Sequence, residues 1–420
     1  MSGMHGVARR RAVIVAFLVL TPLVGAGCTG GAGGPFGAGT VDVRPLVHVP
    51  AAEGVDPTKP LTVTAEPGSR LTDVTLIGPE GQEVAGKLAD DQRSWQTTGL
   101  LWAGTKYLVR VAADNGEGGR GEFTAPVATA PGRAKLTAEL GPDSSGKGLY
   151  GVGQPLTVKL SEPIKDSASR KEVERSLRVV SEPAVTGAWY WVDDRNLHFR
   201  PEKYWPAHAT IKLSFDRPGG LIADGLYVGD PVSRSIRIGD RVEVLIDAAA
   251  DYLTYRRNGE VINTIPVTTG KPGYSTRNGI KVVLGQESTV RMKSETIGIA
   301  EGSSEAFDMD VHWATRVTWS GEYVHAAPWS VAWQGVENVS HGCTGMSTEN
   351  ARWFFGATRV GDVVQVVNSL GKTMEPFGNG FGDWNVSWGE WVKHSALGRT
   401  VNTAGRAEDT AVPGVLLPQI

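Results

Sequence analysis

Short runs of alternating apolar and polar residues dominate the pattern of this chain. In the first third, such runs fall at residues 61–64, 74–77 and 107–111. Alternation with a period of two places every second side chain on the same face of a β-strand. The runs are separated by pairs that favour turns, namely Pro67-Gly68, Gly78-Pro79 and Asn115-Gly116. The pattern therefore predicts a small β-sandwich over residues 41–131.

A second module of the same kind is predicted for residues 132–239. Residues 101–107 of the first module read LWAGTKY and resemble residues 204–211 of the second, which read YWPAHATI. A repeat of roughly a hundred residues built from short strands is typical of tandem immunoglobulin-like domains. Neither module contains a cysteine or a glycine-rich phosphate loop. We therefore expect both to act as spacers that carry the rest of the chain.

The strand pattern continues in the last part of the chain. Residues 242–246 and 252–255 read as a hairpin, and residues 261–268 read as the next strand. These runs predict a third, β-rich domain over residues 240–367. The expected fold class is mainly β, with two immunoglobulin-like sandwiches followed by this domain.

A tail rich in tryptophan is expected at residues 368–420. Trp384, Trp388 and Trp391 have the spacing of one helix face, which predicts an apolar face that packs on the third domain. Stacking of these rings on sugars is the alternative use. From Thr400 onward the chain shows no pattern, and we expect it to be loose.

The N-terminus has the composition of a targeting segment. Arginines at positions 9–11 precede an apolar run at residues 12–24, which is too short for a membrane span, and the run ends before Gly25-Ala26-Gly27-Cys28. This order predicts a signal peptide over residues 1–28 with lipidation of Cys28, although such sites usually have leucine where Gly25 stands. Plain signal cleavage is the alternative. Residues 29–40 are mostly Gly and Ala and read as a tether.

Length and charge indicate how many domains the chain can form and which partners it is not expected to bind. A chain of 420 residues is long enough for two to three domains with cores of their own. The net charge of −3 implies no basic face, so nucleic acid is not expected as a partner. The chain has only two cysteines, and Cys28 in a tether and Cys343 in a motif each suggest a use other than a disulfide.

The motif that carries chemistry is Ser340-His341-Gly342-Cys343. A thiol attacks a carbonyl as the thiolate, and a neighbouring imidazole both lowers the thiol pKa toward neutrality and carries the proton. His325 and His341 are the candidate imidazoles, and Cys343 is the candidate nucleophile. The alternative is that Cys343 is a small buried apolar residue.

The segment from His325 through fourteen further residues to this motif resembles the signature of the L,D-transpeptidases of the YkuD type. These are thiol enzymes that cross-link the stem peptides of peptidoglycan. Residues 323–330 and 350–355 resemble the actinobacterial, mycobacterial-type branch of the family. The resemblance is close from about residue 240 onward and looser over the two modules before it.

The resemblance implies a role for each residue of the motif. Cys343 would be the nucleophile, His325 the general base and acid, and His341 a supporting residue. The backbone N–H groups of Gly342 and Cys343 would form the oxyanion hole, and Ser340 would fix either the turn or His341. The implied reaction transfers an acyl group from a tetrapeptide donor stem to the amine of an acceptor stem, giving a 3–3 cross-link without cofactor or metal. Carbapenem β-lactams are the implied covalent inhibitors.

Substrate contacts are implied for six further residues, which are Met292, Phe307, Ser320, Gly321, Trp329 and Gly345. The chain departs from the family at two of them. Thr344-Gly345 stands where the family has Leu-Asn, and Phe307 stands where this branch has tyrosine. A lost hydrogen bond to an uncharged partner weakens binding by roughly 0.5 to 1.5 kcal/mol. We therefore expect looser recognition of the stem, which Gly345→Asn with Phe307→Tyr would tighten.

Three alternatives to this function remain, and the sequence also predicts where the protein is located. The same thiol with water as acceptor would make an L,D-carboxypeptidase, and a decayed site would leave a non-catalytic wall-binding lipoprotein. A zinc site built from His312, His325 and His341 with Asp308 or Asp310 matches no short metal motif, so no metal is expected. We expect an exported enzyme that a lipid anchor holds at the outer face of the cell membrane, where it reaches peptidoglycan in the cell wall.

Overall fold

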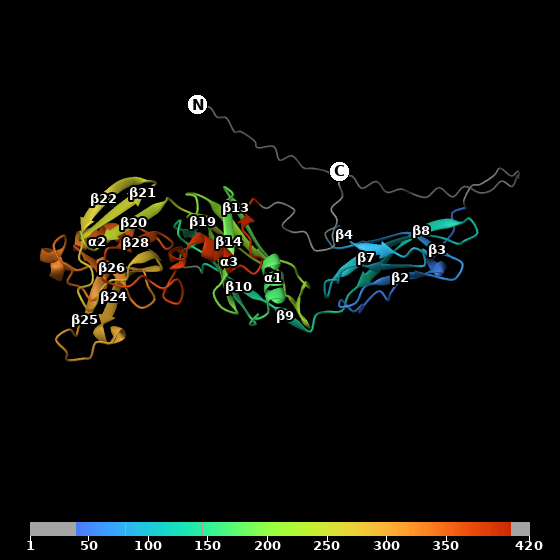
Figure 1. Cartoon of the computed structure of the whole chain (residues 1–420). Helices are drawn as coiled ribbons and strands as arrows, with labels where there is room; N and C mark the ends of the chain where they lie inside the picture. Colours follow the sequence, from blue (N-terminus) through green and yellow to red (C-terminus); the bar gives the residue numbers. More distant parts are fainter. Residues whose placement is uncertain (1–38, 80, 144–145, 405–420) are drawn as a thin grey trace, which may run out of the picture.

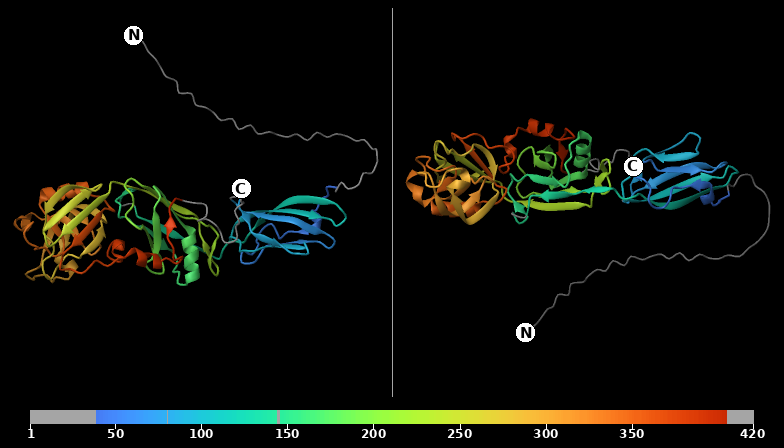
Figure 2. Two further views of the ribbon diagram at one scale, coloured as in Figure 1. Left: turned by 45° about the horizontal axis from the view of Figure 1, so that its top comes forward. Right: turned by 90° about the horizontal axis from the view of Figure 1, so that it is seen from below.

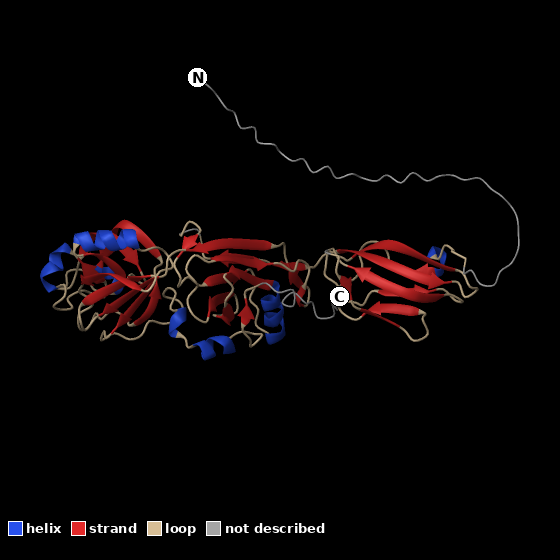
Figure 3. Ribbon diagram, turned by 90° about the horizontal axis from the view of Figure 1, so that it is seen from above, coloured by secondary structure: helices blue, strands red, loops and turns tan. Residues whose placement is uncertain are grey.

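Three β-rich domains follow one another along an extended molecule, in the order of the sequence (Figure 1). The structure, a computed structural model, describes residues 39–79, 81–143 and 146–404. Views from other sides keep the same elongated outline (Figure 2). Strands form most of each domain and the helices are few and short (Figure 3). The predicted mainly β fold class is therefore confirmed.

The first domain is a sandwich of two antiparallel four-stranded sheets. After the short 3-10 helix η1 (Arg44–Leu46), one sheet has the order β1 (Val47–His48), β2 (Thr62–Ala65), β6 (Ser94–Thr97), β5 (Gly86–Leu88). The other has the order β4 (Glu83–Val84), β3 (Arg70–Ile77), β7 (Lys106–Asp114), β8 (Arg120–Ala128). In β7 the alternation predicted from the sequence is the pattern of burial, because Tyr107, Val109 and Val111 face the core between the sheets.

The second domain carries three sheets around one core. The largest has the order β10 (Ala138–Gly141), β12 (Leu156–Leu160), β15 (Asn196–Pro201), β14 (Thr186–Trp191), β29 (Val401–Asn402). Opposite it lie β11 (Leu149–Tyr150), β19 (Val232–Ile238), β16 (Thr210–Phe215) and β13 (Leu177–Glu182). The third sheet is β17 (Leu221–Ala223), β18 (Leu226–Val228) and β9 (Ala134–Leu136). The helix α1 (Ser167–Ser176) begins after Asp166, whose carboxylate caps it by accepting from Ser169 N.

The third domain packs two sheets and a helix. The first sheet has the order β22 (Glu260–Pro266), β21 (Tyr252–Arg257), β20 (Val242–Asp247), β28 (Val363–Val367), β23 (Gly279–Val282). The second has the order β24 (Gly285–Lys293), β25 (Asp308–Arg316), β26 (Tyr323–Ala326), β27 (Thr344–Met346). The helix α2 (Thr348–Ala357) starts where Ser347 caps it, and it buries Ala351 and Phe354 against β25 and β26. The hairpin predicted at residues 242–255 is confirmed as β20 and β21.

A long hairpin projects from the second sheet of this domain. The strands β24 and β25 pair over their full length, and their connection contains the 3-10 helix η2 (Ser294–Ile297) before it returns to Phe307. A second 3-10 helix, η3 (Pro328–Trp333), follows β26 directly. We call the residues from Glu287 to Phe307 the flap.

The tryptophan-rich tail does not pack where the sequence placed it. Its first part contacts the third domain, because the Asn385 amide donates to Ile280 O and its oxygen accepts from Ile280 N. The 3-10 helix η4 (Asp383–Asn385) ends this part. The helix α3 (Trp388–Lys393) that follows packs on the second domain instead, where the fully buried Trp391 donates its indole N–H to Ala188 O at 2.9 Å. The expectation of docking on the catalytic domain is thus wrong for this helix, and burial of Trp391 excludes it from sugar stacking.

The end of the tail is also more ordered than its sequence suggested. The strand β29 pairs with β14 and adds a fifth strand to the second domain. Thr403 Oγ1 accepts from Val185 N at 2.8 Å and shares a hydrogen bond with Ser181 Oγ at 2.6 Å. The prediction of a loose chain from Thr400 onward is therefore wrong up to Ala404.

The predictions about the N-terminus lie outside the described residues. They concern the signal peptide, Cys28 and most of the tether. Over the ranges that the structure does describe, none of the helices is both long enough and apolar enough to cross a membrane.

Candidate active site

A cavity of about 770 Å³ opens on the third domain between the flap and η3. It collects nearly all of the residues that the sequence singled out, which are Cys343, His325, Ser340, His341, Met292, Phe307, Ser320, Gly321, Trp329 and Gly345. Residues of β24 and β25 form one wall. Met292 and Gly345 are more than fifty residues apart in the sequence. The pairing of β24, β25, β26 and β27 brings them to the same cavity.

Cys343 lies directly before β27 on the wall of this cavity. Its Sγ–H donates to the carbonyl of Gly321 at 3.5 Å. Burial raises the pKa of the Cys343 thiol to about 11, and a hydrogen bond from the Tyr323 backbone only partly offsets this. The expectation of a thiol pKa near neutrality is therefore wrong, and the Cys343 thiol is protonated at pH 7.

His325 and Cys343 share one face of the second sheet because β26 and β27 run in parallel. In the β26–β27 ladder His325 is opposite Gly345, which places its side chain on the same face as Cys343, two positions along. Since the carbonyl of Ala326 can only accept, the 2.8 Å contact with His325 Nδ1 is an N–H donor bond. Nε2 therefore carries the lone pair. Burial lowers the pKa of His325, so the ring is neutral and able to accept a proton.

His341 is engaged elsewhere. Its Nε2 lies 2.7 Å from Glu305 Oε2, and the same carboxylate oxygen lies 2.6 Å from Lys271 Nζ. Both partners lower the pKa of Glu305 through these hydrogen bonds, Lys271 more than His341. The His341 ring also contacts Phe307, with centroids 5.3 Å apart. These contacts connect the motif to the end of the flap and favour His325 over His341 as the base.

Ser340 holds the turn around Gly342. Its hydroxyl donates to Cys343 O at 2.6 Å and accepts from Gly342 N at 3.1 Å. Gly342 has φ of +119°, a conformation that L side chains rarely adopt, so glycine is required there. Because its N–H is committed to Ser340, Gly342 does not offer a free donor to an oxyanion. The implied pair of oxyanion-hole donors is corrected to the N–H of Cys343.

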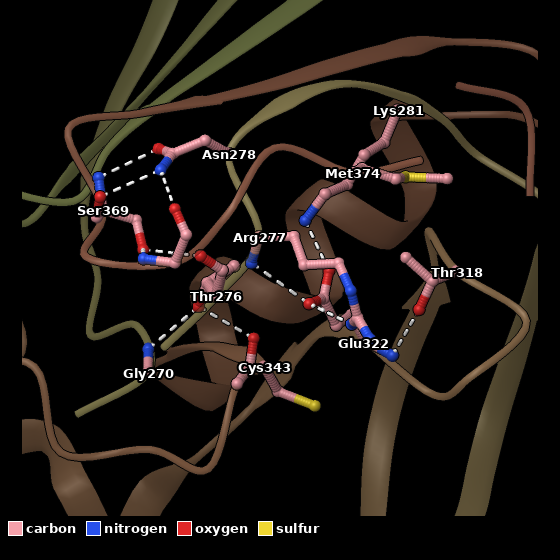
Figure 4. A network of polar contacts seen from close by, with 12 residues as sticks. Gly270, Thr276, Arg277, Asn278, Lys281, Thr318, Glu322, Cys343, Ser369 and Met374 are labelled. Carbon is pink, nitrogen blue, oxygen red and sulfur yellow. Dashed lines mark hydrogen bonds and ion pairs between the residues drawn. The ribbon is translucent and has the colours of Figure 1, made fainter. Parts of the chain in front are cut away.

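Thr276 is a residue whose role the sequence did not reveal. Its hydroxyl donates to Gly342 O at 2.8 Å and accepts from Gly270 N at 2.9 Å (Figure 4). The Gly342 carbonyl and the Cys343 N–H belong to one planar peptide group and point in opposite directions. Thr276 therefore orients the N–H that would face a substrate oxygen. Thr276 comes from the loop before β23, so its spacing to the motif gave no signal.

Comparison with known proteins places the chain among relatives. A family model described as the L,D-transpeptidase catalytic domain matches residues 241–366, and one described as a bacterial Ig domain matches residues 52–219. L,D-transpeptidase 2 of Mycobacterium tuberculosis is 34% identical over 394 residues, which are 91% of this chain and 95% of that protein. The chain belongs to the L,D-transpeptidase family.

Further relatives of this L,D-transpeptidase cover a little more than half of it. L,D-transpeptidase 1 of Mycobacterium tuberculosis is 38% identical over 242 residues, or 58% of this chain and 87% of the relative. A solved structure of an L,D-transpeptidase in complex with imipenem has 37% identity, covers 56% of this chain and 99% of that one, and gives a TM-score of 0.47. An L,D-transpeptidase from Mycobacterium smegmatis has 36% identity, the same 56% and 99% coverage, and a TM-score of 0.45.

Gly345 lines the cavity, but its surroundings leave little room for a side chain. A Cβ added there would lie 2.9 Å from Ala327 Cβ and 3.2 Å from Thr268 Cγ2, so a side chain does not fit without a shift of its neighbours. Gly345 also exchanges backbone hydrogen bonds with Thr268. Tighter donor binding by Gly345→Asn stays a prediction, and a side chain at this position would have to displace Ala327 and Thr268. Phe307, in contrast, lines the cavity with its ring against His341.

The remaining predicted contacts occupy different parts of the cavity wall. Trp329 is 52% exposed, and its ring lies 6.1 Å from that of His325. Ser320 is held by a bond from its N–H to Asn379 Oδ1 at 2.8 Å. Gly321 has open space where a Cβ would stand, and Met292 contributes from β24.

The residues of the alternative zinc site do not come together in the enzyme. His312 pairs with Thr289 Oγ1 at 3.0 Å on an exposed face of β25, and His341 is bound to Glu305. Among the residues that the structure describes, no group of three or more His, Cys, Asp or Glu is arranged to hold a metal ion.

Proposed function

We propose that this L,D-transpeptidase forms 3–3 cross-links in peptidoglycan by cysteine acyl transfer. The observation that carries the proposal is the shared cavity of Cys343 and His325, in which the imidazole is neutral and its Nδ1–H is fixed on Ala326. A fixed tautomer gives the base one defined lone pair. The family membership supports an acyl-transfer reaction on stem peptides.

In the first step a donor stem enters the cavity with the carbonyl of its third, L-configured residue beside Cys343. The sulfur attacks this carbonyl carbon while the Sγ–H proton passes to His325 Nε2. The C–N bond then breaks, and the departing D-alanine takes the proton from the imidazolium. A thioester on Cys343 remains, and it stores the energy of the cleaved amide.

The second step regenerates the thiol. The side-chain amine of the third residue of a neighbouring stem attacks the thioester carbonyl, and His325 takes a proton from that amine. The C–S bond breaks, and the proton passes to the leaving sulfur of Cys343. One amide bond is broken and one is formed, so protons and electrons balance without a further reactant.

Negative charge develops on the carbonyl oxygen in both steps. The Cys343 N–H, oriented by the bond between Thr276 and the Gly342 carbonyl, is the donor placed to receive it. Because the thiol pKa is raised, transfer of the thiol proton to His325 is unfavourable until a substrate carbonyl is in place. The resting thiol is thereby protected from indiscriminate reaction.

The two N-terminal domains serve as spacers in this proposal, and Cys28 as a lipid anchor at the outer face of the cell membrane. The support for the anchor is the order of charged, apolar and small residues in residues 1–28. The support for a spacer is the extended arrangement of the domains (Figure 1). A diacylglycerol group on Cys28 in membrane fractions, found by mass spectrometry, would be the expected result. A soluble mature form that begins elsewhere would contradict the anchor.

The decisive experiment combines a carbapenem with product analysis. Imipenem should add to the wild-type chain with the mass of one acyl group, and Cys343→Ala should take up none and lose cross-linking while its thermal unfolding stays unchanged. Isolated muropeptides incubated with wild type should yield 3–3 dimers. Tripeptides without dimers would instead identify an L,D-carboxypeptidase. Turnover by Cys343→Ala above background would remove Cys343 from the mechanism.

A further inference from the structure

Behind Cys343 lies a cluster of three charged residues that the mechanism above does not use. Lys281 on β23 is fully buried, and its ammonium contacts Glu322 Oε2. Arg277 binds the other carboxylate oxygen through Nη1 at 2.9 Å, and its backbone N–H lies 3.2 Å from the same oxygen. Figure 4 shows Lys281 and Arg277 converging on Glu322 beside Cys343.

Stability alone is a weak reason for such a cluster. Burial lowers the pKa of Lys281, and the neighbouring Glu322 only partly restores it. Removing two charges from water costs several kcal/mol per ion, and well-packed apolar residues often stabilise a fold as much as a buried ion pair does. A role connected with the site beside the cluster is therefore the better explanation.

The backbone connects the cluster to the sulfur. Glu322 stands between Gly321, whose carbonyl accepts from Cys343 Sγ, and Tyr323, whose backbone also hydrogen-bonds that sulfur. The turn before β26 is closed by Val317 N donating to Glu322 O at 2.9 Å and by Glu322 N donating to Thr318 Oγ1 at 2.8 Å. The carboxylate that Lys281 and Arg277 hold thus fixes the segment that positions the thiol.

The same carboxylate disfavours ionisation of the Cys343 thiol. Its negative charge raises the pKa of Cys343, and the Lys281 ammonium acts in the other direction. The Tyr323 phenol and the neutral ring of His325 also face the thiol from β26. Other charged or titratable groups on the cavity wall are Arg291, Lys293, Arg316, Glu337 and His341. Two cations bind Glu322 directly, Arg277 and Lys281, and Lys281 is the fully buried one.

We propose that Lys281 is a positioning residue for the thiolate of Cys343. Its ammonium compensates the charge of Glu322, so that a buried carboxylate can hold the Gly321–Tyr323 segment in place without opposing ionisation of the sulfur. The inference rests on the proposed role of Cys343 as nucleophile. It assigns a function to two residues, Lys281 and Glu322, that do not touch the substrate.

The pH profile of thiol alkylation tests this assignment. Iodoacetamide is reacted with the full chain at a series of pH values, and modification of the peptide that contains Cys343 is followed by mass spectrometry, which separates it from Cys28. Lys281→Met should move the midpoint of the profile upward by about one pH unit, which is about a tenfold slower reaction at pH 7.5. The rate at the high-pH plateau should stay close to that of wild type.

Two variants separate charge from packing. Lys281→Met with Glu322→Gln removes both charges and should return the midpoint to within a few tenths of a unit of wild type. Glu322→Gln alone should shift the midpoint downward, and it carries the test if Lys281→Met does not fold. Lys393→Met is the matched control, because Lys393 forms an exposed ion pair with Glu390 on α3, away from the cluster, and should leave the profile unchanged.

Distinct outcomes would overturn the proposal. A folded Lys281→Met variant with the wild-type midpoint, a double variant shifted as far as the single one, or Glu322→Gln with an unchanged midpoint would each show that the cluster does not act on the thiol charge. A lower plateau with no shift of the midpoint would assign Lys281 a structural role. Failure of the nucleophile assignment itself would appear separately, as imipenem acylation that survives Cys343→Ala.

Discussion

A single backbone carbonyl decides how His325 can act. Ala326 O accepts the Nδ1–H of the ring, so Nε2 is left as the proton acceptor, and burial keeps the ring neutral. His341, with its Nε2 on Glu305, is neither free nor placed for this task. The two histidines of the motif region therefore differ in role because their hydrogen-bond partners differ, although either could serve by residue type.

His325→Ala is expected to slow acylation of Cys343 by imipenem on the order of 10² to 10⁴-fold, the usual contribution of a general base. The rate is measured in a single turnover by intact mass. His341→Ala serves as the comparison and should lose less, since it loosens the flap contact through Glu305 and leaves the base intact. A larger loss for His341→Ala would exchange the two assignments.

The substitution Gly345→Asn tests whether a side chain fits at this position. Gly345→Asn is expected to destabilise the third domain by about 1 to 3 kcal/mol, because its Cβ would press on Ala327 and Thr268. Thermal unfolding followed by tryptophan fluorescence measures the loss. Gly285→Ala, at a site with open space for a Cβ, is the control. If Gly345→Asn left stability unchanged and bound the donor more tightly, an asparagine would fit at this position and contact the donor stem.

At the scale of elements, one carboxylate fastens the tail to the second domain. Glu174 of α1 accepts from Trp191 Nε1 at 2.9 Å, from Ser395 Oγ at 2.7 Å and from the backbone N–H groups of Ala396 and Leu397. Burial raises the pKa of Glu174, while these four donors favour its charged form. The end of α3 is therefore held by a helix that precedes it by more than two hundred residues.

Glu174→Gln should release this end of the tail. An amide keeps only one oxygen acceptor, so donors near the other position lose their partner, at a cost of about 1 to 3 kcal/mol. Limited proteolysis around Ser395, with the fragments identified by mass, should show faster cleavage than in wild type. Glu172→Gln on the same helix removes only partly exposed ion pairs and should change little. Equal cleavage rates for both variants would contradict the role of Glu174 as anchor.

At the scale of the whole molecule, the second and third domains are joined by backbone as well as by the tail. Gly151 N donates to Val360 O at 2.8 Å, and Gly153 N donates to Gly361 O at 2.9 Å. A Cβ at Gly151 would lie 2.2 Å from Asp362 N, so this close approach requires glycine. The catalytic domain is therefore joined to the second domain by a close, hydrogen-bonded backbone contact.

Asp362 at this junction makes stability depend on pH. Burial raises its pKa to about 8, with one oxygen bonded to Arg359 N. An unfolded chain releases this proton near pH 4, so between about pH 4 and 8 the folded state holds a proton that the unfolded state has lost. Stability from this group is thus complete at low pH and is lost as pH rises through 8.

Asp362→Asn should remove that dependence. The variant should gain stability relative to wild type as pH rises from 5 to 8, and the difference should level off above pH 8. Thermal midpoints at pH 5, 7 and 9 measure it. Asp224→Asn, at a largely exposed ion pair in the second domain, is the control and should follow wild type. Parallel pH curves for Asp362→Asn and wild type would show that Asp362 is ionised in the folded enzyme.

The sequence by itself determined the local features of this protein. Alternation predicted strands of the first and third domains, because one buried face imposes a period of two on each strand, and the internal resemblance predicted the second domain. The motif residues Cys343 and His325 could be recognised because the chemistry of a thiol nucleophile limits the residue types at that spacing. The six predicted substrate contacts all line one cavity.

Only the tertiary structure decided which distant residues meet. The buried cluster of Lys281, Glu322 and Arg277, and the bond from Thr276 to Gly342, join segments whose separation leaves no periodic signal. The tail docks on the second domain because partners for Trp391 and β29 lie there, whereas helical spacing specifies an apolar face and not its partner. The pKa values of Cys343 and Asp362 follow from burial, which exists only in the folded chain.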